Sequence, residues 1–217
     1  MAEPADPEAF VRANTVIAAP PLVPEIMLHL ASEITPLWHA TEESLAQSQL
    51  PPPYWAFAWA GGQALARYLL DHPELARGKP ALDFGAGSGL VAIAAARAGA
   101  LVTAAEIDPF ARAAIRLNAA LNHVKVEVES ADAIGRVDAP WELILAGDMC
   151  YERPLAERLV AWLRGLAARG VTVLLGDPGR AYLPTTGLEA LAHYTVPTTR
   201  ELEDRESREG VVWRMMA

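Results

Sequence analysis

Three glycines alternate with other residues directly after an acidic side chain: Asp83 is followed by Gly85, Gly87 and Gly89. A short apolar run precedes this stretch and an alanine-rich run follows it, which predicts a strand, a tight turn and the start of a helix. A glycine turn admits a ligand against backbone that a Cβ atom would block, and the helix behind it offers unpaired N–H groups. The stretch therefore predicts a binding loop for a nucleotide-like ligand.

The spacing of the glycines separates two such ligands. A dinucleotide fold has the pattern G-x-G-x-x-G, whose third glycine would stand at position 90, where this chain has Leu90. Asp83 would repel a pyrophosphate and attract the cationic amino-acid end of S-adenosylmethionine. The Asp-x-Gly-x-Gly-x-Gly pattern resembles motif I of the class I S-adenosylmethionine-dependent methyltransferases, and this resemblance favours S-adenosylmethionine over a dinucleotide. A purely structural glycine turn is the third interpretation.

Further carboxylates follow the later predicted strands. Glu106 comes 21 residues after Gly85, a separation that suits a carboxylate bound to a ribose diol. Asp132 follows the third predicted strand and could accept a hydrogen bond from an adenine amino group. For both residues the alternative is a solvated surface carboxylate. Gly147 and Asp148 end the fourth strand, so they are expected at the same edge of the sheet.

The elements that must position these residues alternate between strand and helix. Helices are predicted over 61–71 and 89–98 and from Asp108-Pro109 and Pro154 onward, because proline suits the first helical turn. This alternation predicts an α/β fold with a seven-stranded, mostly parallel sheet and helices on both faces. The predicted strands are 81–84, 101–107, 124–128, 142–146, 171–175, 191–196 and 211–215.

The two ends of the chain are less regular. Residues 1–22 are interpreted as a loose arm and 24–32 as a helix, and 1–50 as a segment that could cover a domain formed by 51–217 as a lid. Four aromatic residues then fall within 54–59, either packed on the core or forming an aromatic wall that attracts cations. The charged run 201–209 is predicted to be a solvated hairpin loop.

Composition limits the class of protein. The 217 residues carry a net charge of −9, which disfavours nucleic acid as a partner. No apolar run reaches the roughly 18 residues of a membrane helix. The single Cys150 excludes an internal disulfide and suggests a reducing compartment, and no Cys/His cluster suggests a metal site. Acidic residues near the start argue against a signal or transit peptide.

Together, several segments resemble the electron transfer flavoprotein β-subunit lysine methyltransferases, a branch of the seven-strand protein lysine methyltransferases called family 16. They are PPYWAF at 52–57, GGQAL at 61–65, RYLLD at 67–71, IDP at 107–109, GDM at 147–149 and GDPGR at 176–180, with Asp-x-x-Tyr at 148–151. The resemblance implies a class I, Rossmann-like methyltransferase that converts S-adenosylmethionine to S-adenosylhomocysteine. It places Trp59, Gly85, Gly87, Glu106 and Asp132 around the cofactor and Asp148 and Tyr151 at the substrate lysine.

The resemblance also implies a protein substrate, foremost the electron transfer flavoprotein β subunit, with ribosomal proteins as further targets. Asp148 is expected to anchor and orient the lysine rather than act as a strong base, because an exposed carboxylate with a pKa near 4 matches an ammonium poorly. We expect a monomer in the cytoplasm of a bacterium, or in the mitochondrial matrix if the source is a eukaryote. The alternatives are a small-molecule N- or O-methyltransferase and a cofactor-binding module without catalysis.

Overall fold

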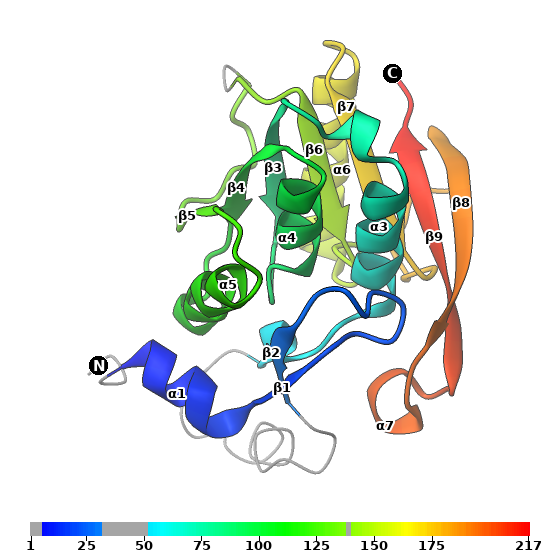
Figure 1. Ribbon diagram of the computed structural model, residues 1–217. Helices are drawn as coiled ribbons and strands as arrows, with labels where there is room; N and C mark the ends of the chain where they lie inside the picture. Colours follow the sequence, from blue (N-terminus) through cyan, green and yellow to red (C-terminus); the bar gives the residue numbers. More distant parts are fainter. Residues whose placement is uncertain (1–5, 32–51, 138–139) are drawn as a thin grey trace.

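The computed structural model describes residues 6–31, 52–137 and 140–217 (Figure 1). Their main feature is a seven-stranded sheet in the order β5-β4-β3-β6-β7-β9-β8, in which β9 runs in the direction opposite to the other six strands. The α/β class and the mostly parallel seven-stranded sheet are confirmed. The strands are β3 (Pro80–Phe84), β4 (Leu101–Ala105), β5 (Glu127–Glu129), β6 (Leu143–Gly147), β7 (Thr172–Asp177), β8 (Leu188–Pro197) and β9 (Ser207–Met215).

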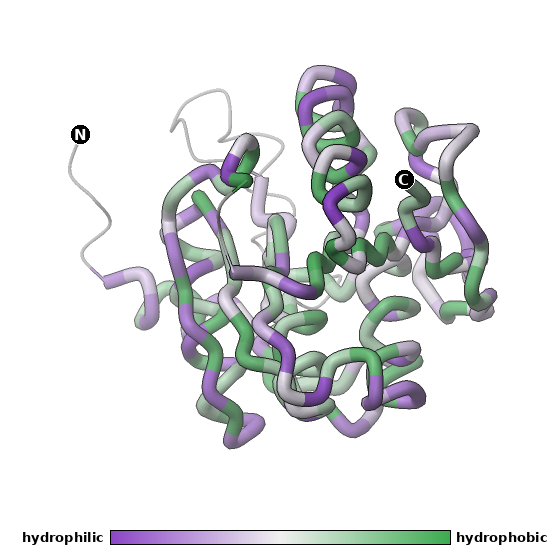
Figure 2. Tube along the Cα trace, turned by 90° about the horizontal axis from the view of Figure 1, so that it is seen from above, coloured by the Kyte–Doolittle hydropathy of each residue, from purple (hydrophilic) through white to green (hydrophobic). Residues whose placement is uncertain are grey.

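Helices cover both faces of the sheet. Three of them, α3 (Ala60–Asp71), α4 (Leu90–Arg97) and α5 (Pro109–Leu121), lie on the near face in Figure 1, and α6 (Arg153–Ala167) lies on the far face. Strand side chains alternate between the two layers, so Ala81 packs with α3 and α4 while Leu82 packs with α6. Figure 2 shows hydrophobic residues along the strands in the middle of the molecule, with hydrophobic and hydrophilic residues alternating in the helices.

Short elements complete the described chain. The 3-10 turns η1 (Tyr54–Ala56) and η2 (Pro73–Leu75) flank α3, and α7 (Arg200–Glu203) lies between β8 and β9. The predicted capped start of α5 is confirmed, because Asp108 Oδ1 accepts a 2.8 Å hydrogen bond from the amide of Phe110. No helix among the described residues is long and apolar enough to cross a membrane.

The N-terminal segment differs from both predictions made for it. Instead of a loose arm, it contains α1 (Pro7–Asn14) and β1 (Val16–Ala18), and Val11 packs with Phe110 of α5. Instead of a helix over 24–32, it contains β2 (Leu28–Leu30), which pairs with β1. The extended form prevails because side chains of α5 bind its backbone: Asn118 Oδ1 accepts from the amide of His29 at 2.8 Å. The remainder of the predicted lid, 1–5 and 32–50, lies outside the described residues.

Two predictions at the edges of the sheet also need correction. The third parallel strand is confirmed as an edge strand, but it covers Glu127–Glu129 rather than 124–128. The run 201–209 is not a solvated loop throughout, because it contributes to α7 and to the start of β9. Within it, the side chain of Glu203 is only 1% exposed. In Figure 1, α7 lies at the carboxyl ends of the parallel strands. The connection between β8 and β9 therefore brings the buried carboxylate of Glu203 to that edge of the sheet.

Candidate active site

The carboxyl ends of β3, β4, β6 and β7 open onto a cavity of about 730 Å³. This size falls within the range of small-molecule sites. Eight of the nine predicted site residues line it: Trp59, Gly85, Gly87, Glu106, Asp132, Gly147, Asp148 and Tyr151. The rule that ligands bind at the carboxyl ends of strands in open α/β sheets therefore locates the cavity correctly.

The glycine loop after β3 forms one wall of the cavity. Gly85 and Gly87 have φ angles of +64° and +52°, a region that side-chain-bearing residues rarely adopt. A Cβ atom at Gly85 would overlap the Sδ atom of Met149, which follows β6. The loop therefore keeps bare backbone facing the cavity, as a cradle for a bound group requires.

Glu106 ties this loop to the next strand. Its Oε2 accepts a 3.0 Å hydrogen bond from the amide of Gly87, and its Oε1 accepts one of 3.0 Å from the amide of Asp108. Burial raises the pKa of Glu106 above its usual value, while these backbone donors oppose the rise. Each oxygen retains a further acceptor position, so contact with a ribose diol stays a prediction that the geometry allows.

Asp132 and Trp59 also have partners within the chain. Asp132 Oδ2 pairs with Arg158 at 3.0 Å, and its Oδ1 accepts from the amide of Ile134 at 2.9 Å. The indole N–H of Trp59 donates to the carbonyl oxygen of Tyr54 at 2.8 Å. Both residues line the cavity, and their contacts with the cofactor stay predictions.

The position of Asp83 corrects the contact predicted for it. Its side chain lies beneath the glycine loop, is only 1% exposed and does not line the cavity. Asp83 Oδ2 accepts a 2.9 Å hydrogen bond from the amide of Ala92 in the first turn of α4. Burial raises its pKa to about 8. Asp83 therefore holds the loop against α4, and its buried position does not support the predicted contact with the cationic end of a ligand.

Asp148 stands where β6 ends, in a left-handed conformation with φ of +58°. Its Oδ2 accepts a 2.7 Å hydrogen bond from the amide of Gly62 in the first turn of α3. That approach depends on two facing glycines, since a Cβ atom at Gly61 would overlap the carbonyl oxygen of Gly176. The first turn of α3 thus lies directly on the ends of β6 and β7, where its free amides favour a negative charge.

The environment of Asp148 differs from the exposed carboxylate expected from the sequence. The residue is 9% exposed, and burial raises its pKa to about 7. The nearby Asp177 adds to the rise, and Arg180 opposes it. A pKa near 7 makes Asp148 a better proton acceptor than the sequence indicated.

Arg180 is the site residue that sequence reasoning missed. Its Nη2 and Nε donate to Asp148 Oδ1 at 2.8 and 3.2 Å. On its other side, Nη2 and Nη1 donate to Glu203 at 2.7 and 3.1 Å. Both of its partners are therefore acidic residues of its own chain. The Gly-Asp-Pro-Gly-Arg turn after β7 was its signal, whereas nothing singled out Glu203.

Aromatic rings form the mouth of the cavity. Tyr54 and Tyr151 meet edge to face with centroids 5.6 Å apart, and Tyr151 is 42% exposed. The guanidinium of Arg180 lies 5.4 Å from the ring centroid of Trp59, within the range of a cation–π contact. Tyr54 and Trp59 line the cavity while Phe57 packs in the core, so the aromatic stretch contributes to both places, and attraction of a substrate cation stays a prediction.

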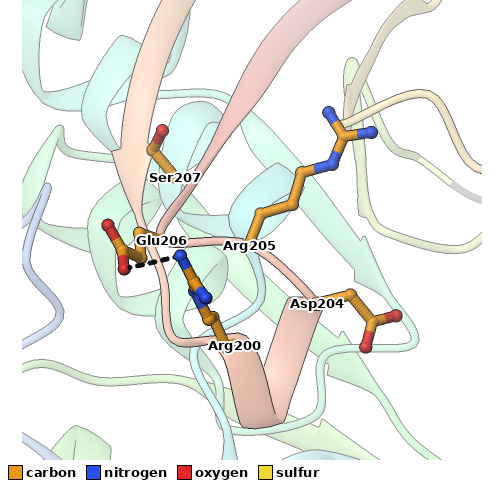
Figure 3. Close-up of a pocket in the computed structure, with 5 residues that line it drawn as sticks. All are labelled: Arg200, Asp204, Arg205, Glu206 and Ser207. Carbon is orange, nitrogen blue, oxygen red and sulfur yellow. Dashed lines mark ion pairs between the residues drawn. The ribbon is translucent and has the colours of Figure 1, made fainter.

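A second cavity, of about 410 Å³, lies at the connection between α7 and β9 (Figure 3). Figure 3 marks an ion pair between Arg200 Nη2 and Glu206 Oε1, which lie 3.1 Å apart, and both side chains are more than 70% exposed. Polar side chains of one short segment form this surface. It contains none of the predicted site residues.

Comparison with known proteins finds methyltransferases. Residues 64–148 match the family of Ribosomal protein L11 methyltransferase (PrmA). The electron transfer flavoprotein beta subunit lysine methyltransferase of Xenopus laevis is 40% identical over 95% of this chain and 86% of its own, and that of Homo sapiens is 38% identical over 95% and 80%. Magnesium protoporphyrin IX methyltransferase from Synechocystis, solved with bound SAH, has 17% identity and a TM-score of 0.52, covering 72% of this chain and 81% of its own.

The fold and the site define an S-adenosylmethionine-dependent methyltransferase. The cavity fits this cofactor, because bare glycine backbone faces it on one side and the carboxylate of Glu106 on another. The chain belongs to the family of electron transfer flavoprotein beta subunit lysine methyltransferases. It is a protein-lysine methyltransferase, as the resemblance implied.

Proposed function

We propose that the enzyme methylates lysine side chains of the electron transfer flavoprotein β subunit and that Asp148 and Tyr151 receive the lysine. The observation that carries this proposal is the position of Asp148: a buried carboxylate at the end of β6 that lines the same cavity as the glycine loop. The names of the relatives that span most of this chain support the choice of substrate. As part of the same proposal, we place the enzyme in a bacterial cytoplasm, or in the mitochondrial matrix of a eukaryote.

The nucleophile in this reaction is a neutral lysine amine. A free lysine has a pKa of about 10.4, so roughly one molecule in two thousand is neutral at pH 7 and the neutral form costs about 4.6 kcal/mol. When bound, S-adenosylmethionine supplies the methyl group that the amine accepts. The protein must therefore bring the lysine in as a cation, release its proton and hold the neutral nitrogen in position.

The residues at the mouth are suited to these tasks. The faces of Tyr54 and Tyr151 attract the arriving ammonium. Asp148 then accepts a hydrogen bond from the nitrogen and fixes the direction of its lone pair, and such positioning is worth several kcal/mol. With its raised pKa, Asp148 can also take the proton briefly before water at the half-exposed Tyr151 carries it away.

Lysines of ribosomal proteins are the second candidate substrate. The match of residues 64–148 to the ribosomal protein L11 methyltransferase family supports this candidate. It covers the glycine loop, Glu106 and Asp148, which are the parts that would handle cofactor and lysine in either case.

The proposal is tested by incubating the enzyme with labelled S-adenosylmethionine and, separately, with the purified flavoprotein, ribosomal protein L11 and a cell extract. We expect label in the flavoprotein β subunit and methyl-lysine in its tryptic peptides by mass spectrometry. Label in L11 would establish the second substrate. Label confined to small molecules of the extract would contradict both substrates and favour a small-molecule methyltransferase.

A further inference from the structure

The guanidinium of Arg180 bridges two carboxylates from distant parts of the chain. Asp148 belongs to the end of β6, and Glu203 belongs to α7 in the connection between β8 and β9. Four nitrogen–oxygen contacts of 2.7 to 3.2 Å join them through Arg180. The side chains are 10% exposed for Asp148, 18% for Arg180 and 1% for Glu203. The bridge is thus largely shielded from water, where such contacts are strongest.

Three carboxylates and two guanidiniums meet around this bridge. Asp177 holds the backbone of the turn, with its Oδ1 accepting from the amides of Gly179 at 2.7 Å and Arg180 at 2.6 Å. Arg208 of β9 lies 3.3 Å from Glu203. The buried Oδ2 of Asp177 has no hydrogen-bond partner among the described residues. The cluster therefore carries one more negative than positive charge when all its acids are ionised, and an arriving lysine ammonium would balance it.

The contacts also decide which part of Asp148 is open to a substrate. A carboxylate offers about four acceptor positions. Arg180 takes both positions of Oδ1, and the amide of Gly62 takes one of Oδ2. A single position on Oδ2 is left for a nitrogen in the cavity. Without the contacts to Arg180, the carboxylate of Asp148 could rotate, and the open acceptor position of Oδ2 would no longer point into the cavity.

We propose that Arg180 is a positioning residue that fixes the charge and orientation of Asp148, and that Glu203 holds Arg180 in this arrangement. The connection between β8 and β9 is then part of the active site. This inference deepens the proposed function and rests on the role given there to Asp148. An arginine is required because its planar fork can bind two carboxylates at once, whereas a lysine offers a single point charge.

The charge that Asp148 carries depends on every group facing it. Arg180 and the amide of Gly62 favour the ionised form, while burial and Asp177 oppose it. The thiol of Cys150 is neutral, since burial raises its pKa to about 12. After loss of the guanidinium, the amide of Gly62 alone among these groups stabilises the ionised form of Asp148. The pKa of Asp148 therefore rises.

The experiment compares Arg180→Met, Arg180→Lys and Glu203→Gln with Glu206→Gln as the matched control. Glu206 lies on the same connection, and its side chain forms an exposed ion pair with Arg200 (Figure 3). For each variant, the affinity for SAH is measured by calorimetry, and kcat and KM are measured with the protein substrate. The pKa of Asp148 is measured by carbon-13 NMR in the absence of substrate. The NMR readout tests the inference even if no protein substrate is methylated, in which case the proposed function alone fails.

We expect Glu203→Gln and Glu206→Gln to bind SAH as the native enzyme does, because the hydrogen bonds of Glu203 go to Arg180. The Arg180 variants should bind it within about fivefold, since Arg180 contributes to the cavity a cation–π contact with Trp59. Arg180→Met should lower kcat about a hundredfold and raise the pKa of Asp148, as expected for loss of a charge-assisted pair. Arg180→Lys should keep the pKa of Asp148 nearer to its native value while kcat still falls. This result would separate the effect of the positive charge from the effect of the orientation that the guanidinium imposes. Glu203→Gln should lower kcat about tenfold, and Glu206→Gln should change nothing.

The inference is wrong if Asp148 titrates in Arg180→Met as in the native enzyme, or if Glu203→Gln retains native kcat. It is also wrong if both variants lose SAH binding together with activity, because the bridge would then serve the fold only. Should Arg180→Met fail to fold, Arg180→Lys and Glu203→Gln decide the question by the same readouts.

Discussion

The amide of Gly62 donates a 2.7 Å hydrogen bond to Asp148 Oδ2, which joins the first turn of α3 to the end of β6 at the site carboxylate. Asp148 thus occupies a place that a capping side chain would fill, since Trp59 at the start of α3 forms no side-chain cap. The free amides of the helix stabilise the negative charge of Asp148, and the carboxylate caps the N-terminus of the helix. The packing of α3 on the strand ends therefore also fixes the position of Asp148, the carboxylate that we propose receives the lysine.

Asp148→Asn is expected to abolish methyl transfer while leaving cofactor binding intact. Asparagine keeps the shape and can accept from Gly62, but it lacks the charge that pairs with Arg180 and with the lysine. We expect kcat to fall at least about a hundredfold, with SAH affinity by calorimetry unchanged. Asp148→Ala should behave alike. Equal turnover in either variant would rule out the role given to Asp148.

Gly61→Ala should destabilise the protein strongly. The new Cβ atom would overlap the carbonyl oxygen of Gly176, and backbone cannot move aside cheaply. We expect a loss of about 2–3 kcal/mol or more in the free energy of unfolding by urea titration. Gly165→Ala in α6 is the matched control, because nothing lies within 4 Å of its Cβ position, and it should stabilise the protein by about 0.5–1 kcal/mol. Equal stability of the two variants would contradict the close approach of α3 to β7.

Much of the site could be predicted because it depends on local spacing and on the direction of parallel strands. A glycine turn after a strand and acids after later strands must meet at one edge of the sheet, which gives Gly85, Glu106 and Asp148 together. Asp83 was misplaced because spacing does not say which way a strand side chain points. Its neighbours Leu82 and Phe84 pack with α6, so Asp83 faces the opposite layer and α4.

The parts that could not be predicted are set by contacts between distant segments. Glu203 stands in a run of charges where burial of one member leaves no local pattern, and its partner Arg180 comes 23 residues earlier. Similarly, residues 28–30 have spacing compatible with a helix, but Asn118 of α5 binds their extended backbone. Tertiary hydrogen bonds overrode local preference in both places.

Gly85→Arg is expected to block cofactor binding before it affects the lysine site. Arginine would strain a backbone with φ of +64° and push a side chain into the cavity against Met149. We expect SAH affinity by calorimetry to fall below detection. Gly78→Arg is the control, since Gly78 has a similar φ of +74° with nothing within 4 Å of its Cβ position. If both variants bind SAH equally, the glycine loop is not the cradle.

The pH dependence of kcat/KM should report Asp148. Two proton losses precede transfer, one from the lysine with a pKa of about 10.4 and one from Asp148 with a pKa of about 7. Activity should therefore rise with pH, with a slope of about two on a logarithmic plot below pH 7 and of about one above it. A slope of one throughout would show that Asp148 is ionised over the whole range or is not required.

The buried Asp83 should make folding stability fall as the pH rises. Its pKa is about 8 in the folded protein and about 3.9 when unfolded, so between these values the folded state holds a proton that the unfolded state has lost. Asp83→Asn removes this dependence while keeping an acceptor for Ala92. We expect its melting temperature to exceed that of the native protein by at least about 3 °C at pH 9 and to match it at pH 4.5. A higher melting temperature of the native protein than of Asp83→Asn at pH 9 would contradict the burial of the Asp83 carboxylate.

The most direct test of the central claim is a crystal structure of the enzyme with SAH and a peptide from its lysine-containing substrate. The account predicts that the lysine nitrogen lies within hydrogen-bond distance of Asp148 Oδ2, beside the paired rings of Tyr54 and Tyr151, and faces the sulfur of SAH, with Arg180 still bound to Oδ1. A lysine bound away from Asp148, or Asp148 turned away from the sulfur, would contradict it.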